Sequence, residues 1–225
     1  MVNTSYPTKN ALIIGGGFVN TGSNTFKVIE NSDFIIAADG GLDNCIHLNI
    51  SPDLIIGDLD SVTNSSLDLA KDNNWAIRKF PRNKNETDGE LAILAAIDYG
   101  AKNINIIGAL KGNDRFDHPI GNMFLISSDK FKDQNITLVE ETYEIRVLRK
   151  HQILTLSGQP GDIVSLISIS DISKGIITWG LKYDLSGVSI LRGSTRGMSN
   201  ELIWRNIEIS ISDGILMVYL EHSPV

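Results

Sequence analysis

The chain has 225 residues, of which 42% are hydrophobic and 21% charged, and its formal net charge at pH 7 is −7. This is the composition of an ordinary globular protein, long enough for one large domain or two small ones. Its acidic surface would repel nucleic-acid phosphates and anionic lipid, so we expect no nucleic acid and no membrane among its partners.

The sequence shows no sign of secretion or of metal binding through sulfur. Residues 1–10 are polar, without the basic and apolar regions of a signal peptide, and no apolar run approaches the ~20 residues that cross a bilayer. The single cysteine, Cys45, excludes an intrachain disulfide. The four histidines and this cysteine lack zinc-ligand spacing. We therefore expect a soluble cytoplasmic protein.

Short aliphatic runs alternate with helix-like stretches in the first two-thirds of the chain. Several runs are apolar at consecutive positions, which is typical of strands buried on both faces of a parallel sheet. The predicted strands are Ala11–Ile14, Phe34–Ala38, Leu54–Ile56, Trp75–Phe80, Ile104–Ile107 and Ile136–Val139. The clearest helix spans Thr87–Tyr99, with Gly100 just beyond its end. The pattern predicts a Rossmann-like, mostly parallel α/β domain over residues 1–142.

The sequence pattern changes after about residue 143. Short runs rich in Ile, Val, Leu, Ser and Thr are separated by Gly, Pro, Asp and Asn, without a helical pattern between them. The runs are Arg146–Leu148, Ile153–Leu156, Ile163–Ile169, Ile176–Trp179, Val188–Leu191, Ile207–Ile211 and Ile215–Leu220. Strands at such spacing predict an all-β sandwich or barrel over residues 143–225.

Acidic residues follow the second and third predicted strands. Asp39 precedes the paired glycines Gly40 and Gly41, which would let the backbone approach a ligand closely. Asp58 and Asp60 are spaced i, i+2, so on an extended chain both carboxylates project from one face. At roughly 5 Å they would repel by about 3 kcal/mol at an effective dielectric near 20, unless a proton, water or cation offsets the charge. Mg²⁺ binds such carboxylates together with substrate phosphate oxygens.

A second group of candidates precedes the clearest helix. Asp88 could add a carboxylate to the metal site, while Thr87 lies at a helix N-terminus whose free N–H groups suit a phosphate. The alternative is that both residues simply cap the helix. Together with Asp39 and the Asp58–Asp60 pair, Asp88 favours the metal interpretation.

The stretch Gly108–His118 follows another predicted strand and combines a loop with charged side chains. Arg115 could neutralise charge on phosphoryl oxygens, and Asp117 could orient an arginine or bind metal. His118 is a candidate ligand contact, although a lone histidine is more often structural. The stretch Gly17–Ser23 has the glycine spacing of a P-loop but lacks its lysine, which predicts an ordinary turn.

Two polar stretches of the β half, Gly180–Leu185 and Gly193–Glu201, lie between apolar runs. Their hydroxyl, amide and carboxylate groups could recognise a heteroaromatic ring. Trp179 and Tyr183 could offer aromatic faces to a cation. Taken singly, each stretch is better explained as an ordinary β-turn with exposed Ser and Asn.

Six motifs in order closely resemble the thiamine diphosphokinase family, and the match covers nearly the whole chain from Ala11. They are Asp39–Gly41, Pro52–Ser61, Glu86–Asp88, Arg115–His118, Gly180–Tyr183 and Ser199–Glu201. The resemblance implies an Mg²⁺-dependent transfer of diphosphate from ATP to the hydroxyl of thiamine. It implies a homodimer with thiamine between the α/β domain of one subunit and the β domain of the other.

The resemblance also implies roles for individual residues. ATP and Mg²⁺ would bind at Asp39, Asp58, Asp60, Thr87 and Asp88, with Mg²⁺ on Asp58, Asp60 and Asp88. Arg115 and Asp117 would lie near the phosphates, with His118 beside them, and Gly40 and Gly41 near the nucleotide. Tyr183, Ser199 and Asn200 would contact thiamine. The expected catalytic residues are thus four aspartates and one arginine: Asp58, Asp60, Asp88, Asp117 and Arg115.

The chain departs from the family pattern at several places. Asn85 stands where the family usually has Asp, and Pro119 where Thr is usual. Tyr183 stands where Trp is common, and the loop before Arg115 is longer than the family's.

Two other functions remain open from sequence alone. A haloacid-dehalogenase-like phosphatase is suggested by the Asp58–Val62 signature, although its nucleophile would follow the first strand rather than the third. A non-catalytic thiamine or nucleotide sensor is the other, with Asn85 as the candidate loss of an acidic ligand.

Overall fold

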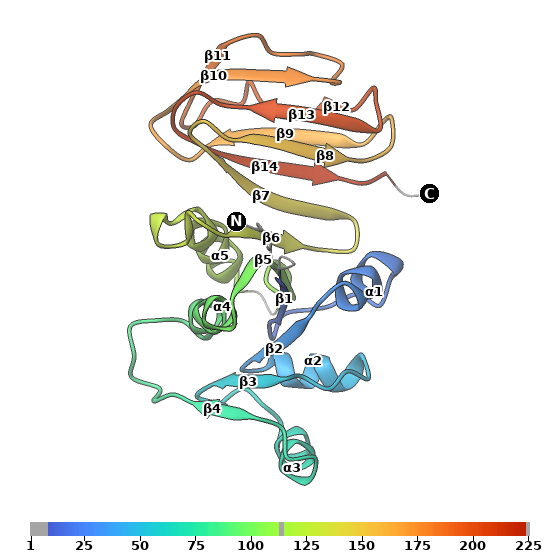
Figure 1. The fold of residues 1–225 in the computed structure, drawn as a ribbon, viewed down its shortest axis with the longest axis vertical. Coiled ribbons are helices and arrows are strands. Elements are labelled where there is room, and N and C mark those ends of the chain that lie inside the picture. Colours follow the sequence, from blue (N-terminus) through green and yellow to red (C-terminus); the bar gives the residue numbers. More distant parts are fainter. Residues whose placement is uncertain (1–8, 113–114, 224–225) are drawn as a thin grey trace, which may run out of the picture. The chain divides into compact units, whose positions relative to one another are not determined.

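A computed structural model describes residues 9–112 and 115–223. The chain forms two compact units (Figure 1). Unit 1 comprises the residues up to Leu125 together with Asp133–Glu141, and unit 2 comprises Ile126–Lys132 together with the residues from Thr142 onward. Unit 2 therefore takes in a short segment, Ile126–Lys132, that precedes the last strand of unit 1 in the sequence.

Unit 1 is built on six parallel strands in the order β6-β5-β1-β2-β3-β4. Their bounds are β1 (Lys9–Ile14), β2 (Phe34–Ala38), β3 (Leu54–Gly57), β4 (Ile77–Lys79), β5 (Ala101–Ile107) and β6 (Asn135–Val139). All six predicted strands are present. Ala11–Ile14 are at most 1% exposed, because helices cover both faces of the sheet and a consecutive apolar run is then buried throughout.

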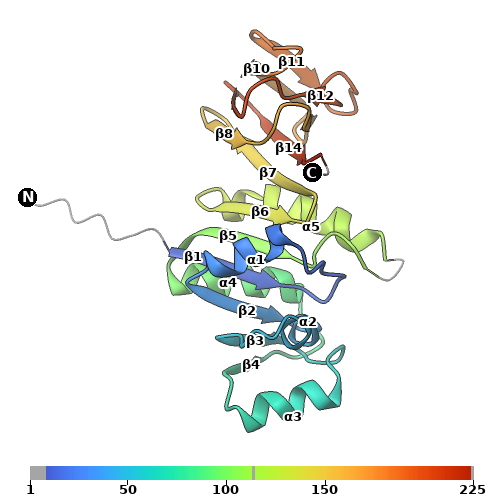
Figure 2. The same cartoon turned by 90° about the vertical axis from the view of Figure 1, so that its right-hand side faces the viewer.

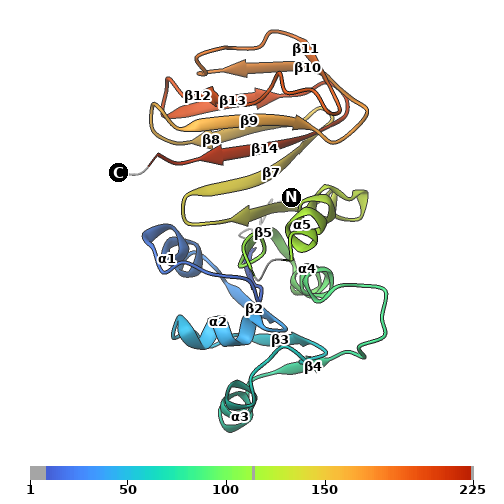
Figure 3. The ribbon, with the colours of Figure 1, turned by 180° about the vertical axis from the view of Figure 1, so that it is seen from behind.

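The described connections of this unit carry the helices α1 (Ser23–Glu30), α2 (Gly41–His47), α3 (Asn64–Asp72) and α4 (Asp88–Tyr99), and α5 (Asp117–Ser127) begins in unit 1 and ends in unit 2. Figures 2 and 3 show α1 and α2 on one face of the strands, and α4 and α5 on the other. Strand order reverses between β1 and β5, where the connections change faces. In open α/β sheets, ligands bind beyond the carboxyl ends of the strands at such a reversal.

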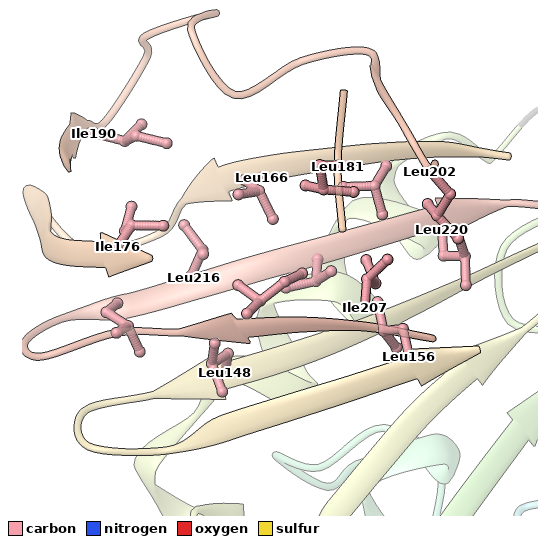
Figure 4. Packing of buried hydrophobic residues seen from close by; sticks show 14 residues of the cluster. Leu148, Leu156, Leu166, Ile176, Leu181, Ile190, Leu202, Ile207, Leu216 and Leu220 are labelled. Atoms are coloured by element: carbon pink, nitrogen blue, oxygen red, sulfur yellow. The ribbon is translucent and has the colours of Figure 1, made fainter. Parts of the chain in front are cut away.

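Unit 2 is an antiparallel sandwich. One layer has the order β12-β9-β14-β7 and the other β11-β10-β13-β8. The bounds are β7 (Tyr143–Arg149), β8 (Ile153–Ser157), β9 (Ile163–Ser168), β10 (Ile172–Trp179), β11 (Val188–Leu191), β12 (Asn200–Glu201), β13 (Asn206–Ser210) and β14 (Ile215–Glu221). Inward Leu, Ile and Val side chains of both layers form its core (Figure 4). A 3₁₀ turn at Asp129–Phe131 also belongs to this unit. The predicted fold class, parallel α/β followed by antiparallel β, is confirmed.

The single cysteine lies in the core of unit 1. Cys45 on α2 is 0% exposed, and burial raises the pKa of its thiol to about 12. A buried thiol of this kind packs as a small apolar side chain. Within residues 9–112 and 115–223, no helix has the length and apolar content needed to span a bilayer.

Candidate active site

Three carboxylates meet at the carboxyl ends of β2 and β3. One oxygen atom from each of Asp39, Asp58 and Asp60 lies within 4.8 Å of the others. Asp39 Oδ1 is buried and has no hydrogen-bond partner among the described residues. Burial, and then the negative charges of Asp88 and Asp58, raise the pKa of Asp39. Such a set of oxygen atoms favours a bound cation.

The turn after β2 is tightly packed. Asp39 has a positive φ of 48°, an uncommon conformation for a residue with a side chain. Gly40 then forms the N-cap of α2, and Gly41 is its first residue. A Cβ atom at Gly41 would lie far inside contact distance of the Ile14 carbonyl oxygen at the end of β1. Glycine is therefore required at position 41, and it brings the start of α2 against β1.

The segment after β3 folds into a local turn. The Asp60 N–H donates to Asp58 Oδ1 at 3.0 Å, and Leu59 between them has a positive φ of 67°. Asp60 accepts from the Ser61 hydroxyl at 3.1 Å and pairs with Arg82 at 3.3 Å. These contacts position two carboxylates that would otherwise repel each other. The strand-like projection predicted from i, i+2 spacing is replaced by this turn, although both carboxylates still reach one cluster.

Asp88 reaches the same cluster from the first turn of α4. A Cβ atom at Gly57 would lie 3.1 Å from Asp39 Cβ and 3.2 Å from Asp88 Oδ1, so the two aspartates flank Gly57. Thr87 is the N-cap, and its hydroxyl accepts the Glu90 N–H at 3.2 Å. The capping alternative is therefore correct for Thr87, while Asp88 points toward the other acidic residues.

Lys84 is a member of this site to which sequence reasoning assigned no role. Its ammonium lies 2.8 Å from Asp88 Oδ1 and 3.9 Å from Asp58 Oδ2. The only indication in the sequence was its position four residues before Asp88, just ahead of the Glu86–Asp88 motif. A loop of unknown conformation gave no indication of where its side chain pointed.

The loops after β1 and β5 are joined by backbone hydrogen bonds at the point where strand order reverses. The N–H of Gly17 donates to the Gly108 carbonyl at 2.9 Å, and that of Phe18 to the Lys111 carbonyl at 2.7 Å. A Cβ at Gly15 would lie 2.7 Å from the Gly108 carbonyl oxygen. The glycines near residue 17 thus make a tight turn, as expected, whereas the pairing of this turn with the β5 loop was not predicted.

A buried carboxylate lies at the end of β6. Glu140 is 4% exposed, and its Oε2 lies 3.6 Å from the ammonium of Lys111. Burial raises the pKa of Glu140, and the charge of Lys111 opposes that effect. The next residue, Glu141, accepts the backbone N–H groups of Asn24 and Thr25, both at 3.1 Å, and so neutralises the start of α1.

Arg115 and Asp117 bind each other. The guanidinium donates two hydrogen bonds to the carboxylate, from Nε at 2.9 Å and Nη2 at 2.8 Å. The hydrogen bond with Arg115 lowers the pKa of Asp117 to about 2. Both side chains are exposed, as is His118. Asp117 therefore orients the arginine, one of the two roles predicted for it. Asn113 and Asp114 of the predicted loop lie outside the described residues.

Pro119 falls in the first turn of α5, where a missing N–H is not needed for the helix. The unusual residue therefore does not interrupt α5. Asn122, one turn further on, donates to the Ala109 carbonyl at 2.8 Å and so ties α5 to the loop after β5.

The predicted thiamine-side residues of unit 2 are adjacent in the structure. Asn200 uses its amide to hold the backbone of Tyr183, accepting its N–H at 3.1 Å and donating to its carbonyl at 2.8 Å. The Tyr183 ring is 67% exposed. Ser199 has a positive φ of 57°, and its N–H donates to Ser165 Oγ at 3.0 Å. The structure thus brings these three residues together and gives Asn200 a positioning function.

Trp179 does not lie with Tyr183 in the turn but on the outer face of β10. Trp179, Ile177 and Ile153 are 56%, 53% and 69% exposed. They line a shallow hollow together with the polar residues Glu208 and Ser210. On this face the apolar side chains of β10 and β8 therefore lie on either side of Glu208 and Ser210 of β13.

The acidic site in unit 1 is suited to Mg²⁺. Its donors are hard carboxylate oxygens, and one buried oxygen, Asp39 Oδ1, is otherwise without a donor. One oxygen atom from each of the three carboxylates lies within 4.8 Å of the others, so all three face the same small volume, as the oxygen ligands of one cation do. The same edge of the sheet carries Lys111 and the N-terminus of α4, both suited to phosphate.

Two family models match the chain. The catalytic domain of thiamin pyrophosphokinase matches residues 25–138, and the vitamin B1 binding domain of thiamin pyrophosphokinase matches residues 143–216. Thiamine pyrophosphokinase of Bacillus subtilis (strain 168) is 26% identical over 210 residues, covering 93% of this chain and 97% of the relative. Thiamine pyrophosphokinase 1 of Arabidopsis thaliana is 26% identical over 239 residues, covering 95% and 86%. The crystal structure of thiamin pyrophosphokinase from Geobacillus thermodenitrificans superposes with a TM-score of 0.80 at 27% identity, covering 95% of this chain and 98% of the other.

Proposed function

Since this chain belongs to the thiamin pyrophosphokinase family, we propose that it transfers a diphosphate group from ATP to the hydroxyl of thiamine, giving thiamine diphosphate and AMP. As a member of this family the chain is a transferase. The observation that supports the ATP and Mg²⁺ requirement most directly is the convergence of Asp39, Asp58 and Asp60 at the carboxyl edge of the sheet. That convergence lies within the segment matched by the catalytic-domain model.

In the proposed reaction the thiamine oxygen attacks the β-phosphorus in line, and the bond from that phosphorus to the α-phosphate oxygen breaks. Mg²⁺ held by Asp58, Asp60 and Asp88 would supply neutralisation of the phosphate charge. Asp58 or Asp88 accepts the proton of the attacking hydroxyl. Arg115, oriented by Asp117, binds phosphoryl oxygens.

Unit 2 supplies the thiamine contacts in this proposal. Tyr183 offers an exposed ring to the cationic thiazolium or to the pyrimidine. Ser199 and Asn200 lie beside it, and the Asn200 amide fixes the backbone that carries the ring. A tyrosine in place of the family's usual tryptophan still provides an aromatic face, although a smaller one.

The test is an end-point assay with purified protein, ATP, Mg²⁺ and thiamine, in which AMP, ADP and thiamine phosphates are separated by chromatography. We expect thiamine diphosphate and AMP in equal amounts, and neither product when EDTA replaces Mg²⁺. ADP with thiamine monophosphate would instead indicate an ordinary kinase.

The same assay separates the remaining alternatives. A phosphatase would release phosphate without requiring thiamine, and the position of Asp58 after β3, the third strand, already differs from that fold's arrangement. A sensor would bind ATP and thiamine without consuming either. A sensor does not need the acidic residues of the catalytic site and could lose them. This chain keeps all four of them, which favours the enzyme: Asp39, Asp58, Asp60 and Asp88.

We also propose that the protein is a homodimer. The exposed apolar side chains Ile153, Ile177 and Trp179 lie on one face on either side of Glu208 and Ser210, and we propose that a second copy covers them. Light scattering after gel filtration should give about 49 kDa, twice the chain mass of 24.6 kDa. Ile177→Glu should shift the population toward the monomer, whereas Lys71→Glu on the surface of α3 should not. A wild-type mass of one chain would contradict the dimer.

A further inference from the structure

Lys84 is an unusually enclosed lysine. Its side chain is 10% exposed, and those of Asp58 and Asp88 beside it are 14% and 24% exposed. Lysine side chains are almost never buried unless they are paired, because the ammonium loses its hydration. The ammonium of Lys84 therefore depends more on its carboxylate neighbours for stabilisation than the ammonium of an exposed lysine does.

The ammonium lies at the place of greatest negative charge in unit 1. Its distances are 2.8 Å to Asp88 Oδ1 and 3.9 Å to Asp58 Oδ2. Asp39 is close to both: an oxygen of Asp39 lies within 4.8 Å of one of Asp58, and Asp39 and Asp88 flank Gly57. Carboxylates gathered at this spacing destabilise one another unless a positive charge lies among them. Lys84 supplies a positive charge to Asp58 and Asp88, as Arg82 does to Asp60.

The lysine is carried into the cluster by a fixed backbone. Its N–H donates to the Arg82 carbonyl at 3.2 Å, and the Thr87 cap fixes the start of α4 three residues later. Asp88 is the first residue of that helix. The cation and one of its carboxylate partners are thus held on the same short segment of the chain.

We propose that Lys84 is the resident counter-ion of the acidic cluster and competes with Mg²⁺ for it. In the metal-free protein its ammonium holds Asp58 and Asp88 together. A divalent cation on the same carboxylates must displace the ammonium from at least one of them, because two cations cannot share so small a space without repulsion. The inference rests on the proposed function, since it assumes that the cluster binds Mg²⁺.

A competitor of this kind would set the Mg²⁺ affinity. With the lysine in place, the cluster stays ordered at low metal concentration but releases Mg²⁺ more readily. Without it, the free carboxylates repel one another and the metal binds more tightly. The role is one of positioning, since it acts through Asp58 and Asp88, and it is measurable without turnover.

The test is titration calorimetry with Mg²⁺ alone, without nucleotide, on the full chain and three variants. Lys84→Met removes the charge and keeps most of the stem, and should bind Mg²⁺ about tenfold more tightly than wild type. Lys84→Arg keeps the charge and should stay near the wild-type affinity. Lys71→Met is the matched control, because Lys71 pairs with Asp68 at 2.9 Å on exposed α3, and it should leave the affinity unchanged.

Thermal unfolding provides a second readout. In EDTA, Lys84→Met should melt below wild type, and saturating Mg²⁺ should raise its melting temperature by more than it raises that of wild type. Should Lys84→Met fail to fold, Lys84→Gln serves for the same comparisons, since it also removes the charge but keeps a polar end.

Each result has a definite meaning. Equal or weaker Mg²⁺ binding by Lys84→Met, with wild type binding normally, would overturn the competition while leaving the proposed function in place. Absence of Mg²⁺ binding by wild type and every variant at millimolar concentration would instead overturn the metal site itself, and the competition with it.

Discussion

Replacing Asp60 by asparagine should abolish diphosphate transfer while leaving the fold intact. The variant keeps the shape of the side chain but removes the negative charge that, in the proposed reaction, holds Mg²⁺. Metal neutralisation of phosphate charge is worth several kcal/mol, and each 1.4 kcal/mol corresponds to a factor of ten. We therefore expect the rate of thiamine diphosphate formation to fall by at least about 10²-fold.

The fold should tolerate this change because of the surroundings of Asp60. Its side chain is 42% exposed, and its ion pair with Arg82 is on the surface, where such pairs contribute about 0–1 kcal/mol. The melting temperature in EDTA should stay close to that of wild type. Asp68→Asn on exposed α3 is the control and should retain full activity. Wild-type turnover by Asp60→Asn would remove this residue from the metal site.

Gly41→Ala should destabilise unit 1 strongly. The added methyl group would overlap the Ile14 carbonyl oxygen, which belongs to the backbone of a central strand and cannot rotate away. Overpacking of this kind costs about 3 kcal/mol. For a chain of this size that corresponds to a melting temperature lower by on the order of 10 °C, which differential scanning calorimetry would measure.

A second glycine in a helix provides the matched comparison. Gly121 lies within α5, and a Cβ atom there would meet nothing within 4 Å. Gly121→Ala should therefore stabilise the protein by about 0.5–1 kcal/mol, because alanine loses less conformational freedom in a helix. Melting of Gly41→Ala together with wild type would show that α2 shifts freely away from β1.

The parallel sheet could be predicted from sequence because its strands are buried on both faces. Ala11–Ile14 and Phe34–Ala38 are apolar at every position, and short uninterrupted apolar runs of this kind indicate strands buried on both faces. The two-residue strand β12 was missed because Asn200 and Glu201 carry no apolar pattern. The inclusion of Ile126–Lys132 in unit 2 was also missed, since it depends on tertiary contacts.

The candidate site, like the fold, could be predicted from sequence only in part. Asp39 and Asp58 could be brought together from sequence, because the carboxyl ends of parallel strands share one edge, and Asp88 was added to them from the start of the predicted helix. The position of Lys84 could not, since a loop side chain has no periodicity to indicate its direction. Nor could the use of Glu141 to cap α1, a contact with Asn24 across 117 residues of sequence. Asn200 was selected for its chemistry as a ligand contact, and the structure adds that its amide is already bound to Tyr183.

The enclosure of Cys45 makes the chain convenient for site-specific labelling. Its thiol is fully buried with a pKa of about 12, so almost none of it is thiolate at the pH used for maleimide coupling. Fluorophores would therefore attach only to introduced cysteines, such as Asp72→Cys in unit 1 and Ser186→Cys in unit 2, both at exposed positions. Energy transfer between the two dyes would then report the separation of the units during turnover, with the native cysteine left in place.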